Sequence, residues 1–388
     1  MPEVADIFNA HGDDYCRIHR LSFEQSKVMR MIRACRTAKL GGHLERCDQC
    51  GFERPAYNSC RNRHCPKCQT MAKEQWLNAR RAELLPTGYF HVVFTLPRLI
   101  NPVILCNRKT LLNLLFEAAS AVLAAFAKDP RWRLEGRIGT IAILHTWSQT
   151  LMDHFHLHCL IPAGALSPEE TAWKKARARF LFEAKALAKA FKYQYLLGLR
   201  RLFERNELIF PTNASRFAAP PAFSALLHAA RQKDWVIYLK RPMTGPDQVI
   251  EYLGRYTHRV AISNNRIVSV ENGSVTFSYR DRSDSNRRKT MTLAATEFIR
   301  RFLLHVLPDG FVKIRYFGFL SHHNKNRCIP LIRGLIGTFA PPPEKIKETA
   351  AETMLRVTGL DITCCPRCGK GRMKKRVLPT DPFIWDSS

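Results

Sequence analysis

The sequence predicts an α+β protein in which an antiparallel sheet is flanked by helices and preceded by a cysteine-rich module. Short apolar segments at 90–96, 139–147 and 156–161 indicate strands, and longer amphipathic segments between them indicate helices. Two Cys-x-x-Cys pairs, which begin at Cys47 and Cys65, indicate the module. Because hairpins or long excursions join most of the strands, we expect the sheet to be antiparallel.

The expected elements follow one another along the whole chain. Glycine at 41 and proline at 86 end the first two helices, and an Asn-Gly pair is a strong hairpin signal. In chain order we expect helices 23–39 and 71–84, strand 90–96, helix 111–127, strands 139–147 and 156–161, one or two basic helices between 167 and 207, strand 235–240, a helix with Tyr252 and Tyr256, and a hairpin turning at Asn272-Gly273. The predicted domains are 1–87, 88–320 and 321–388.

Charge indicates a polyanionic partner. The 388 residues include 61 Lys and Arg against 33 Asp and Glu, a formal net charge of +28. Such an excess favours nucleic acid and predicts that affinity falls steeply with added salt, although ribosomal or membrane-surface binding would give a similar balance. With 46% hydrophobic residues the chain is expected to fold as two or three globular domains rather than as a basic tail.

Membrane insertion and secretion are not expected. No stretch reaches the roughly 18 uninterrupted apolar residues that a spanning helix needs. The most apolar segment, at 111–126, is interrupted by Asn113, Glu117 and Ser120. The N-terminal residues lack the basic and apolar regions of a signal peptide. We therefore expect a cytoplasmic protein.

Thirteen cysteines in such a compartment indicate metal chemistry or ordinary burial rather than disulfides. Cys47, Cys50, Cys65 and Cys68 form two knuckles, which suit one tetrahedral zinc ion held by four thiolates. Cys60 and His64 stay open as replacements for one ligand or as parts of a poorer second site. The knuckles' loop is basic, with Arg61 and Arg63 among its residues, so it is either a DNA-binding surface or a structural cap.

A second metal site is only half visible in the sequence. Cys365 and Cys368 form one knuckle, and its partners would have to come from elsewhere, with Cys328 or the pair His322 and His323 as donors. The remaining cysteines lie in apolar surroundings, where a small buried hydrophobe is the better interpretation: Cys16, Cys35, Cys106 and Cys159.

The most informative pattern is a histidine pair followed much later by a tyrosine pair. His156 and His158 flank Leu157 on a predicted strand, so both imidazoles share a face and can hold one metal ion while the leucine enters the core. Tyr252 and Tyr256 are spaced i and i+4 and share one face of a helix. Together they suggest metal-assisted attack by tyrosine on a phosphodiester, although core packing would explain each pair alone.

The order of these elements resembles the HUH endonuclease superfamily and, more specifically, the two-tyrosine rolling-circle transposases of the insertion sequence 91 family. The resemblance covers most of the chain. It rests on five segments in one order: the cysteine module at 47–68, His91 to Pro97, His145 to Cys159, Tyr252 to Ile262, and Phe302 to Gly318.

This resemblance implies an HUH endonuclease-like core at 88–320 and a zinc-binding, DNA-binding domain at 1–87. It implies a nuclease and strand transferase that acts on single-stranded DNA at the ends of a mobile element. One tyrosine would form a 5′-phosphotyrosine and free a 3′-hydroxyl, and the second would allow a further cleavage before rejoining. Host replication proteins would be indirect partners. The cofactors implied are a divalent ion, Mg²⁺ or Mn²⁺, at the histidines and a structural Zn²⁺.

The third ligand of the catalytic metal is expected to be His145, on the preceding strand. Its spacing from His156 and His158 resembles that of three-histidine relaxases in the same superfamily. Gln149, His154 and Glu251 are the alternatives.

Arginines beside the tyrosines are further candidates for DNA binding. Arg255 and Arg259 flank the two tyrosines and suit phosphate contacts, although a solvated basic helix face explains them nearly as well.

Two alternative functions stay open. A plasmid relaxase or replication initiator would use the same chemistry at one origin strand, and a noncatalytic zinc-dependent regulator would use none.

Overall fold

The computed structural model describes residues 2–177, 181–212, 214–243, 245–256, 261–281, 283–337 and 348–378. It leaves out the side chains of Arg241, Pro246, Asp247, Arg255, Tyr256, Val377 and Leu378. The fold is α+β, as predicted, and its centre is a five-stranded antiparallel sheet. The strand order is β12 (Ile314–Gly318), β4 (Gly139–Trp147), β5 (Asp153–Pro162), β3 (Tyr89–Thr95) and β8 (Ile237–Met243).

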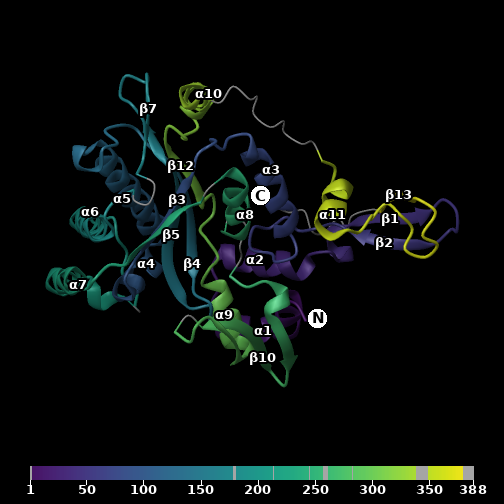
Figure 1. The fold of residues 1–388 in the computed structure, drawn as a ribbon. Helices are drawn as coiled ribbons and strands as arrows, with labels where there is room; N and C mark the ends of the chain where they lie inside the picture. The colour runs from purple at the N-terminus through teal and green to yellow at the C-terminus, as the bar shows by residue number, and fades with distance from the viewer. Residues whose placement is uncertain are drawn as a thin grey trace.

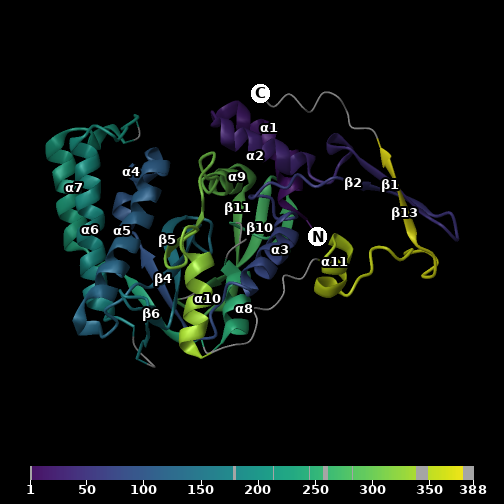
Figure 2. The ribbon, with the colours of Figure 1, turned by 90° about the horizontal axis from the view of Figure 1, so that it is seen from above.

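Helices cover both faces of this sheet (Figures 1 and 2). One face bears α4 (Asn101–Cys106), α5 (Arg108–Lys128), α6 (Ala184–Glu204) and α7 (Pro220–Gln232), and the other bears α3 (Gln69–Arg81) and α8 (Pro246–Tyr256). Alternate residues of β5 serve the two faces, so Leu157 and Cys159 enter the core beneath α5 and α6. Leu160 joins the core beneath α3 and α8.

Helix α5 is the one helix of the described chain that is long and apolar enough to cross a membrane. Leu111, Leu115 and Leu123 on this helix are buried in the same core as the sheet residues and α6. A core helix of a globular domain meets the same criteria of length and composition, and the packing of α5 matches that case.

A second core joins the N-terminal helices to a later hairpin region. Helices α1 (Val4–Ile18) and α2 (Phe23–Ala34) pack with α9 (Ala295–Leu303) and with the sheet of β9 (Ile267–Glu271), β10 (Ser274–Asp281) and β11 (Arg287–Ala294). Phe8 meets the ring of Phe302 edge to face at 5.3 Å. Segments almost 300 residues apart in the chain therefore form one packed unit.

The two end regions of the described chain also meet, in an arm that projects from the main body (Figure 1). Strand β13 (Met373–Leu378) pairs with β1 (Gly42–Cys47), which also pairs with β2 (Glu53–Tyr57). Helix α11 (Ala350–Thr358) lies where the arm meets α3. Helix α10 (Lys325–Ile336) belongs to the main body, where it packs in the same core as α3 and α8. The region after 321 is thus divided between the main body and the arm.

The structure differs from the prediction at 167–177, where helix was expected. There a short hairpin forms from β6 (Gly164–Leu166) and β7 (Trp173–Lys175), and the helix begins only at Ala184. A methyl group at Gly164 would lie 2.5 Å from the Trp173 ring, so the close approach of these strands depends on glycine. The hairpin through Asn272-Gly273 forms as predicted, between β9 and β10.

Gly318→Ala should destabilise the sheet, because Gly318 has φ +63° and an added Cβ would lie 1.7 Å from the carbonyl oxygen of Ile138. We expect a loss of more than about 1 kcal/mol in the free energy of unfolding, measured by urea denaturation. Gly334→Ala in α10 is the matched control, since nothing lies within 4 Å of its added Cβ. Equal stability of the two variants would contradict the role given to Gly318.

Candidate active site and metal centres

Three histidines meet on the face of the sheet beneath α8. The antiparallel register places His145 of β4 directly opposite His156 of β5, and His158 follows two residues later on the same face. One ring nitrogen from each of the three lies within 4.8 Å of the other two. The Nδ1 of His156 donates a hydrogen bond of 2.8 Å to the carbonyl oxygen of His154, which fixes the ring and leaves Nε2 as its ligand atom.

These nitrogens fit a divalent cation by number and spacing. Three imidazoles leave open coordination positions for substrate oxygens, as in catalytic sites. Imidazole suits Mn²⁺ and later transition ions better than Mg²⁺, which prefers oxygen. Of the alternative third ligands, Glu251 is exposed. Among the His, Cys, Asp and Glu residues of the described chain, the third member of the cluster is His145.

Tyr252 reaches this cluster from α8. Its hydroxyl lies 3.1 Å from Nδ1 of His158 and 2.5 Å from Nε2 of His91. The helix holds it there through Val249 and Leu253, which are fully buried against the sheet. A phenol is thus in hydrogen-bond contact with a ring that also belongs to the histidine cluster.

Sequence reasoning missed His91 as part of the site, although His91 was noted within a matching segment. It lies on β3, its ring stacks on His158 with centroids 5.2 Å apart, and its Nε2 is 2.9 Å from His158 Nδ1. Burial lowers the pKa of His91 to about 3, so the ring is neutral near pH 7. The available signal was a single polar residue within the otherwise apolar stretch Tyr89–Phe94.

Other predicted site residues are placed less completely. Tyr256 lies in the last turn of α8, four residues after Tyr252, but its side chain and that of Arg255 are outside the described part of the chain. Arg259 lies outside the described residues altogether. Arg61 is exposed, as a DNA contact would be.

Arg63 has a role in the fold, and its assignment to a DNA-binding surface stays a prediction. Its guanidinium donates to the carbonyl oxygens of Phe311, at 2.5 Å, and Pro308, at 2.9 Å. The side chain is partly buried, and this burial lowers its pKa. Arg63 therefore fastens the cysteine module to the main body.

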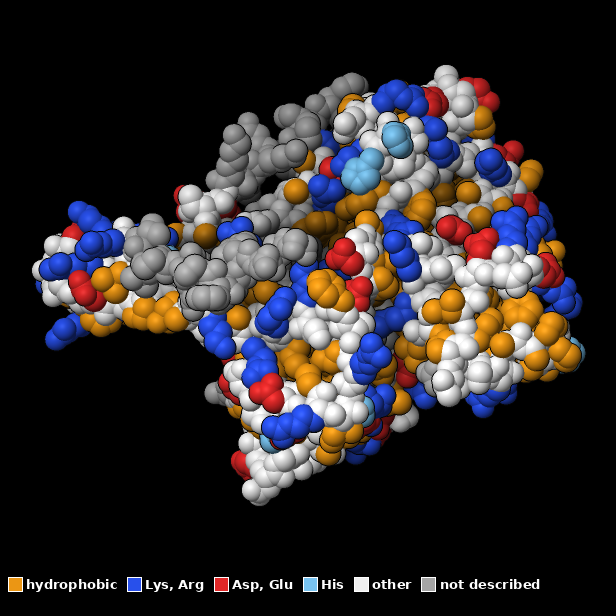
Figure 3. All heavy atoms as spheres, turned by 180° about the vertical axis from the view of Figure 1, so that it is seen from behind, with side chains coloured by type: hydrophobic (Ala, Val, Ile, Leu, Met, Phe, Trp, Pro, Cys, Tyr) orange, Lys and Arg blue, Asp and Glu red, His pale blue; other side chains and the backbone are white. Residues whose placement is uncertain are grey.

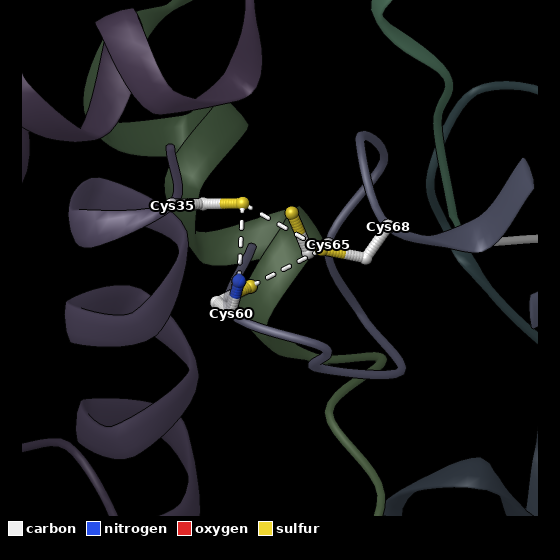
Figure 4. A group of neighbouring side chains, drawn as sticks. All are labelled: Cys35, Cys60, Cys65 and Cys68. Atoms are coloured by element: carbon white, nitrogen blue, oxygen red, sulfur yellow. Dashed lines mark hydrogen bonds between the residues drawn. The ribbon is translucent and has the colours of Figure 1, made fainter. Parts of the chain in front are cut away.

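The cysteine knuckles do not share one site, so the predicted set of Cys47, Cys50, Cys65 and Cys68 is wrong as a single cluster. Cys65 and Cys68 instead converge with Cys35 and Cys60 (Figure 4). Cys35 ends α2 and Cys68 begins α3, so the cluster ties two helices to the loop between them. From the sequence, Cys35 was interpreted as an ordinary buried residue because its surroundings are helical and apolar.

The first knuckle belongs to another cluster. Cys47 and Cys50 converge with Cys365 and Cys368, so neither Cys328 nor the histidines at 322 and 323 complete the C-terminal half-site. Cys328 lies instead 3.5 Å from the guanidinium of Arg137. The cause is the pairing of β13 with β1, which brings the two knuckles together from opposite end regions of the chain.

The thiols of the cluster of Cys35, Cys60, Cys65 and Cys68 cannot all ionise side by side without a cation. Hydrogen bonding to the neighbouring sulfurs, Cys35 first, raises the pKa of Cys65 and lowers that of Cys68. A divalent ion removes this conflict because it favours the thiolate form of every ligand. Four sulfurs at tetrahedral spacing are the usual donor set of structural zinc.

Comparison with known proteins gives two family matches and two curated relatives. A family described as "Putative transposase" matches residues 139–328, and one described as "Transposase zinc-binding domain" matches residues 7–96. The chain is 46% identical to "Putative transposase y4qJ" of Sinorhizobium fredii, over all of this chain and 99% of that protein. It is 30% identical to "Transposase for insertion sequence element IS801" of Pseudomonas savastanoi pv. phaseolicola, over 89% of this chain and 82% of that protein. No solved structure matches significantly.

Cys35→Ser should remove one equivalent of zinc per chain and destabilise the connection of α2 to the loop at 60–68, since structural zinc contributes directly to folding. Zinc content by elemental analysis and thermal unfolding measure the two effects. The control is Cys16→Ser, because Cys16 is exposed on α1 and belongs to neither cluster. Unchanged zinc content in Cys35→Ser would show that this cluster is not a metal site.

Proposed function

The chain belongs to the transposases of the insertion sequence 91 family, with an N-terminal zinc-binding domain, and from this premise we propose that it cleaves and rejoins single-stranded DNA at the ends of a mobile element. The observation that carries the proposal is the contact of the Tyr252 hydroxyl with His158, a member of the histidine cluster. A nucleophile and a metal-binding group so close together serve the attack on a phosphodiester.

In the proposed reaction the Tyr252 oxygen attacks phosphorus. The new P–O bond joins the tyrosine to the 5′ side of the break, and the bond from phosphorus to the 3′ oxygen breaks. The phenol loses its proton, and the departing oxygen gains one and becomes a 3′-hydroxyl. Because the tyrosyl ester keeps the energy of the phosphodiester, a 3′-hydroxyl can reverse the step and rejoin DNA without a nucleotide cofactor.

The chain's own residues prepare the tyrosine for this attack. The neutral ring of His91 can accept a hydrogen bond from the Tyr252 hydroxyl and so direct a lone pair of its oxygen outward. A free phenol has a pKa near 10 and is a weak nucleophile at neutral pH. A divalent ion at His145, His156 and His158, for which we propose Mn²⁺ or Mg²⁺, would make phosphorus more electrophilic by binding a nonbridging oxygen.

Tyr256 is proposed as the second nucleophile. The i, i+4 spacing puts its Cα one turn from that of Tyr252 on the same face of α8. Two attacking groups near one site allow two cleavages before the strands are rejoined, which a rolling-circle mechanism at two element ends requires.

The projecting arm is proposed as a second DNA contact. Figure 3 shows Lys and Arg side chains gathered on the arm, at the left of that view. The exposed cations there are Arg46, Arg367, Lys370, Arg372, Lys374, Lys375 and Arg376. Such a surface binds phosphates without reading sequence, and it adds to the salt dependence of binding.

Tyr252→Phe should lower the yield of covalent protein–DNA adduct by at least about 100-fold if Tyr252 attacks first, because the nucleophilic oxygen is absent. The assay uses labelled single-stranded oligonucleotides that carry hairpins and candidate element ends, with Mn²⁺, and denaturing electrophoresis. Tyr193→Phe is the control, since Tyr193 is exposed on α6 away from the site.

The double variant Tyr252→Phe, Tyr256→Phe decides the proposal. If it still forms adduct, the tyrosine assignment is wrong. If the wild type forms none with any end sequence while still binding DNA, a noncatalytic regulator explains the protein better. Adduct formation at one strand of a plasmid origin alone would indicate a replication initiator.

His145→Ala should raise the Mn²⁺ concentration for half-maximal adduct formation by about tenfold or more, because one of three ligands is lost. DNA binding in the absence of Mn²⁺ should stay unchanged. His228→Ala is the control, since His228 is exposed on α7, which covers the other face of the sheet. An equal Mn²⁺ requirement in both variants would exclude His145 as a ligand.

A further inference from the structure

The cysteine cluster in the arm lies partly beyond both matched families. Cys47 and Cys50 fall within the zinc-binding match at 7–96, but Cys365 and Cys368 follow the last matched residue, 328. We propose that these four cysteines bind a second structural Zn²⁺, which staples the C-terminal segment 361–378 onto the N-terminal module. This inference does not depend on the catalytic proposal.

The two halves of the cluster have the same local shape. Each is Cys-x-x-Cys-Gly, and the glycines at 51 and 369 have φ +69° and +65°. Backbone N–H groups point at the sulfurs, with Cys50 donating to Cys47 at 3.4 Å and Gly371 donating to Cys368 at 3.3 Å. Two tight turns with amides directed at the sulfurs form the ligand arrangement of a zinc ribbon.

The sulfurs from opposite halves are placed for one ion and not for bonding to each other. Cys47 and Cys368 lie 3.8 Å apart and Cys50 and Cys365 lie 3.6 Å apart, while a disulfide needs about 2 Å. The backbones are interlocked as well. Asp48 N–H donates to the Arg372 carbonyl at 3.1 Å, and the Asp48 carboxylate accepts from Arg372 N–H at 2.8 Å.

Packing in the arm is too slight to hold it without a metal. In the described chain, the buried cluster there consists of Cys47, Cys365 and Met373, with Phe52 and Cys368 partly buried beside them. Two of the three buried residues are themselves ligands. A module with so small a core usually depends on a metal for its folding.

The backbone at Gly371 lies so close to the cluster that it leaves no room for a side chain there. An added Cβ at Gly371 would lie 2.4 Å from the Cys47 sulfur. The same sulfur lies at the end of β1, opposite Met373 of β13. The strand pairing and the sulfur geometry thus require each other, so loss of the ion should release β13 from β1.

The test measures zinc in the full-length protein by elemental analysis. The double variant Cys365→Ser, Cys368→Ser should contain one equivalent less than the wild type. Adding Cys47→Ser to that variant should remove no more, because all three residues belong to one site. Cys364→Ser is the matched control and should keep the wild-type content, since Cys364 lies next to Cys365 but outside the cluster.

Proteolysis tests whether the bound ion holds the C-terminal segment on the N-terminal module. Trypsin sites lie at Lys370, Arg372, Lys374, Lys375 and Arg376. Native trypsin cleavage there should rise by about tenfold or more in the double variant, because local opening exposes the strand. Thermal unfolding of the main body should stay unchanged, which shows that the variant has folded.

Two outcomes would overturn the inference: equal zinc content in the double variant and the wild type, or a disulfide between Cys50 and Cys365 in protein purified without oxidant. Chelator treatment of the wild type gives a check that needs no substitution. The arm site should release its zinc before the other, because Cys50 is exposed whereas Cys35, Cys60 and Cys65 are buried.

Discussion

The proposed catalytic site depends on the two-residue alternation of β5 held in register against β4. Leu157 is fully buried beneath α5 and α6, so the strand cannot rotate or slip by one residue without moving that side chain toward α8. The same constraint turns His156 and His158 to the opposite face, and the pairing of His145 with His156 supplies the third ring. Core packing on one face thereby fixes ligand geometry on the other.

Helix α8 lies across that face and adds the proposed nucleophile. Val249 and Leu253 of α8 enter the core between helix and sheet, and Tyr252, beside them in the sequence, reaches His158 and His91. The reacting group and the metal-binding group thus belong to separate elements joined by one apolar contact surface. Sites built on rigid helices and strands hold such distances more closely than loops do.

Much of the fold and of the candidate site could be predicted from the sequence, and the predictions that were wrong have a common cause. Periodicity gave the strands with His145, His156 and His158 and the helix with Tyr252, because those patterns are local. Partners of Cys47 could not be found, since Cys365 lies more than 300 residues away and only strand pairing joins them. His91 and Cys35 were missed as site residues because a lone polar or thiol group in an apolar segment usually indicates burial alone. The hairpin at 164–175 forms through tertiary contacts that override helical composition.

The junction of β1 with β13 also has a bearing on the order of events during synthesis. A ribosome delivers β1 early, and its partner strand emerges only after the whole sheet of the main body has been made. Until then β1 has β2 alone beside it, one edge unpaired and two thiolates without counterparts. The arm is therefore the last part of the described molecule to mature, and a prematurely terminated polypeptide would carry an intact histidine site without a finished arm.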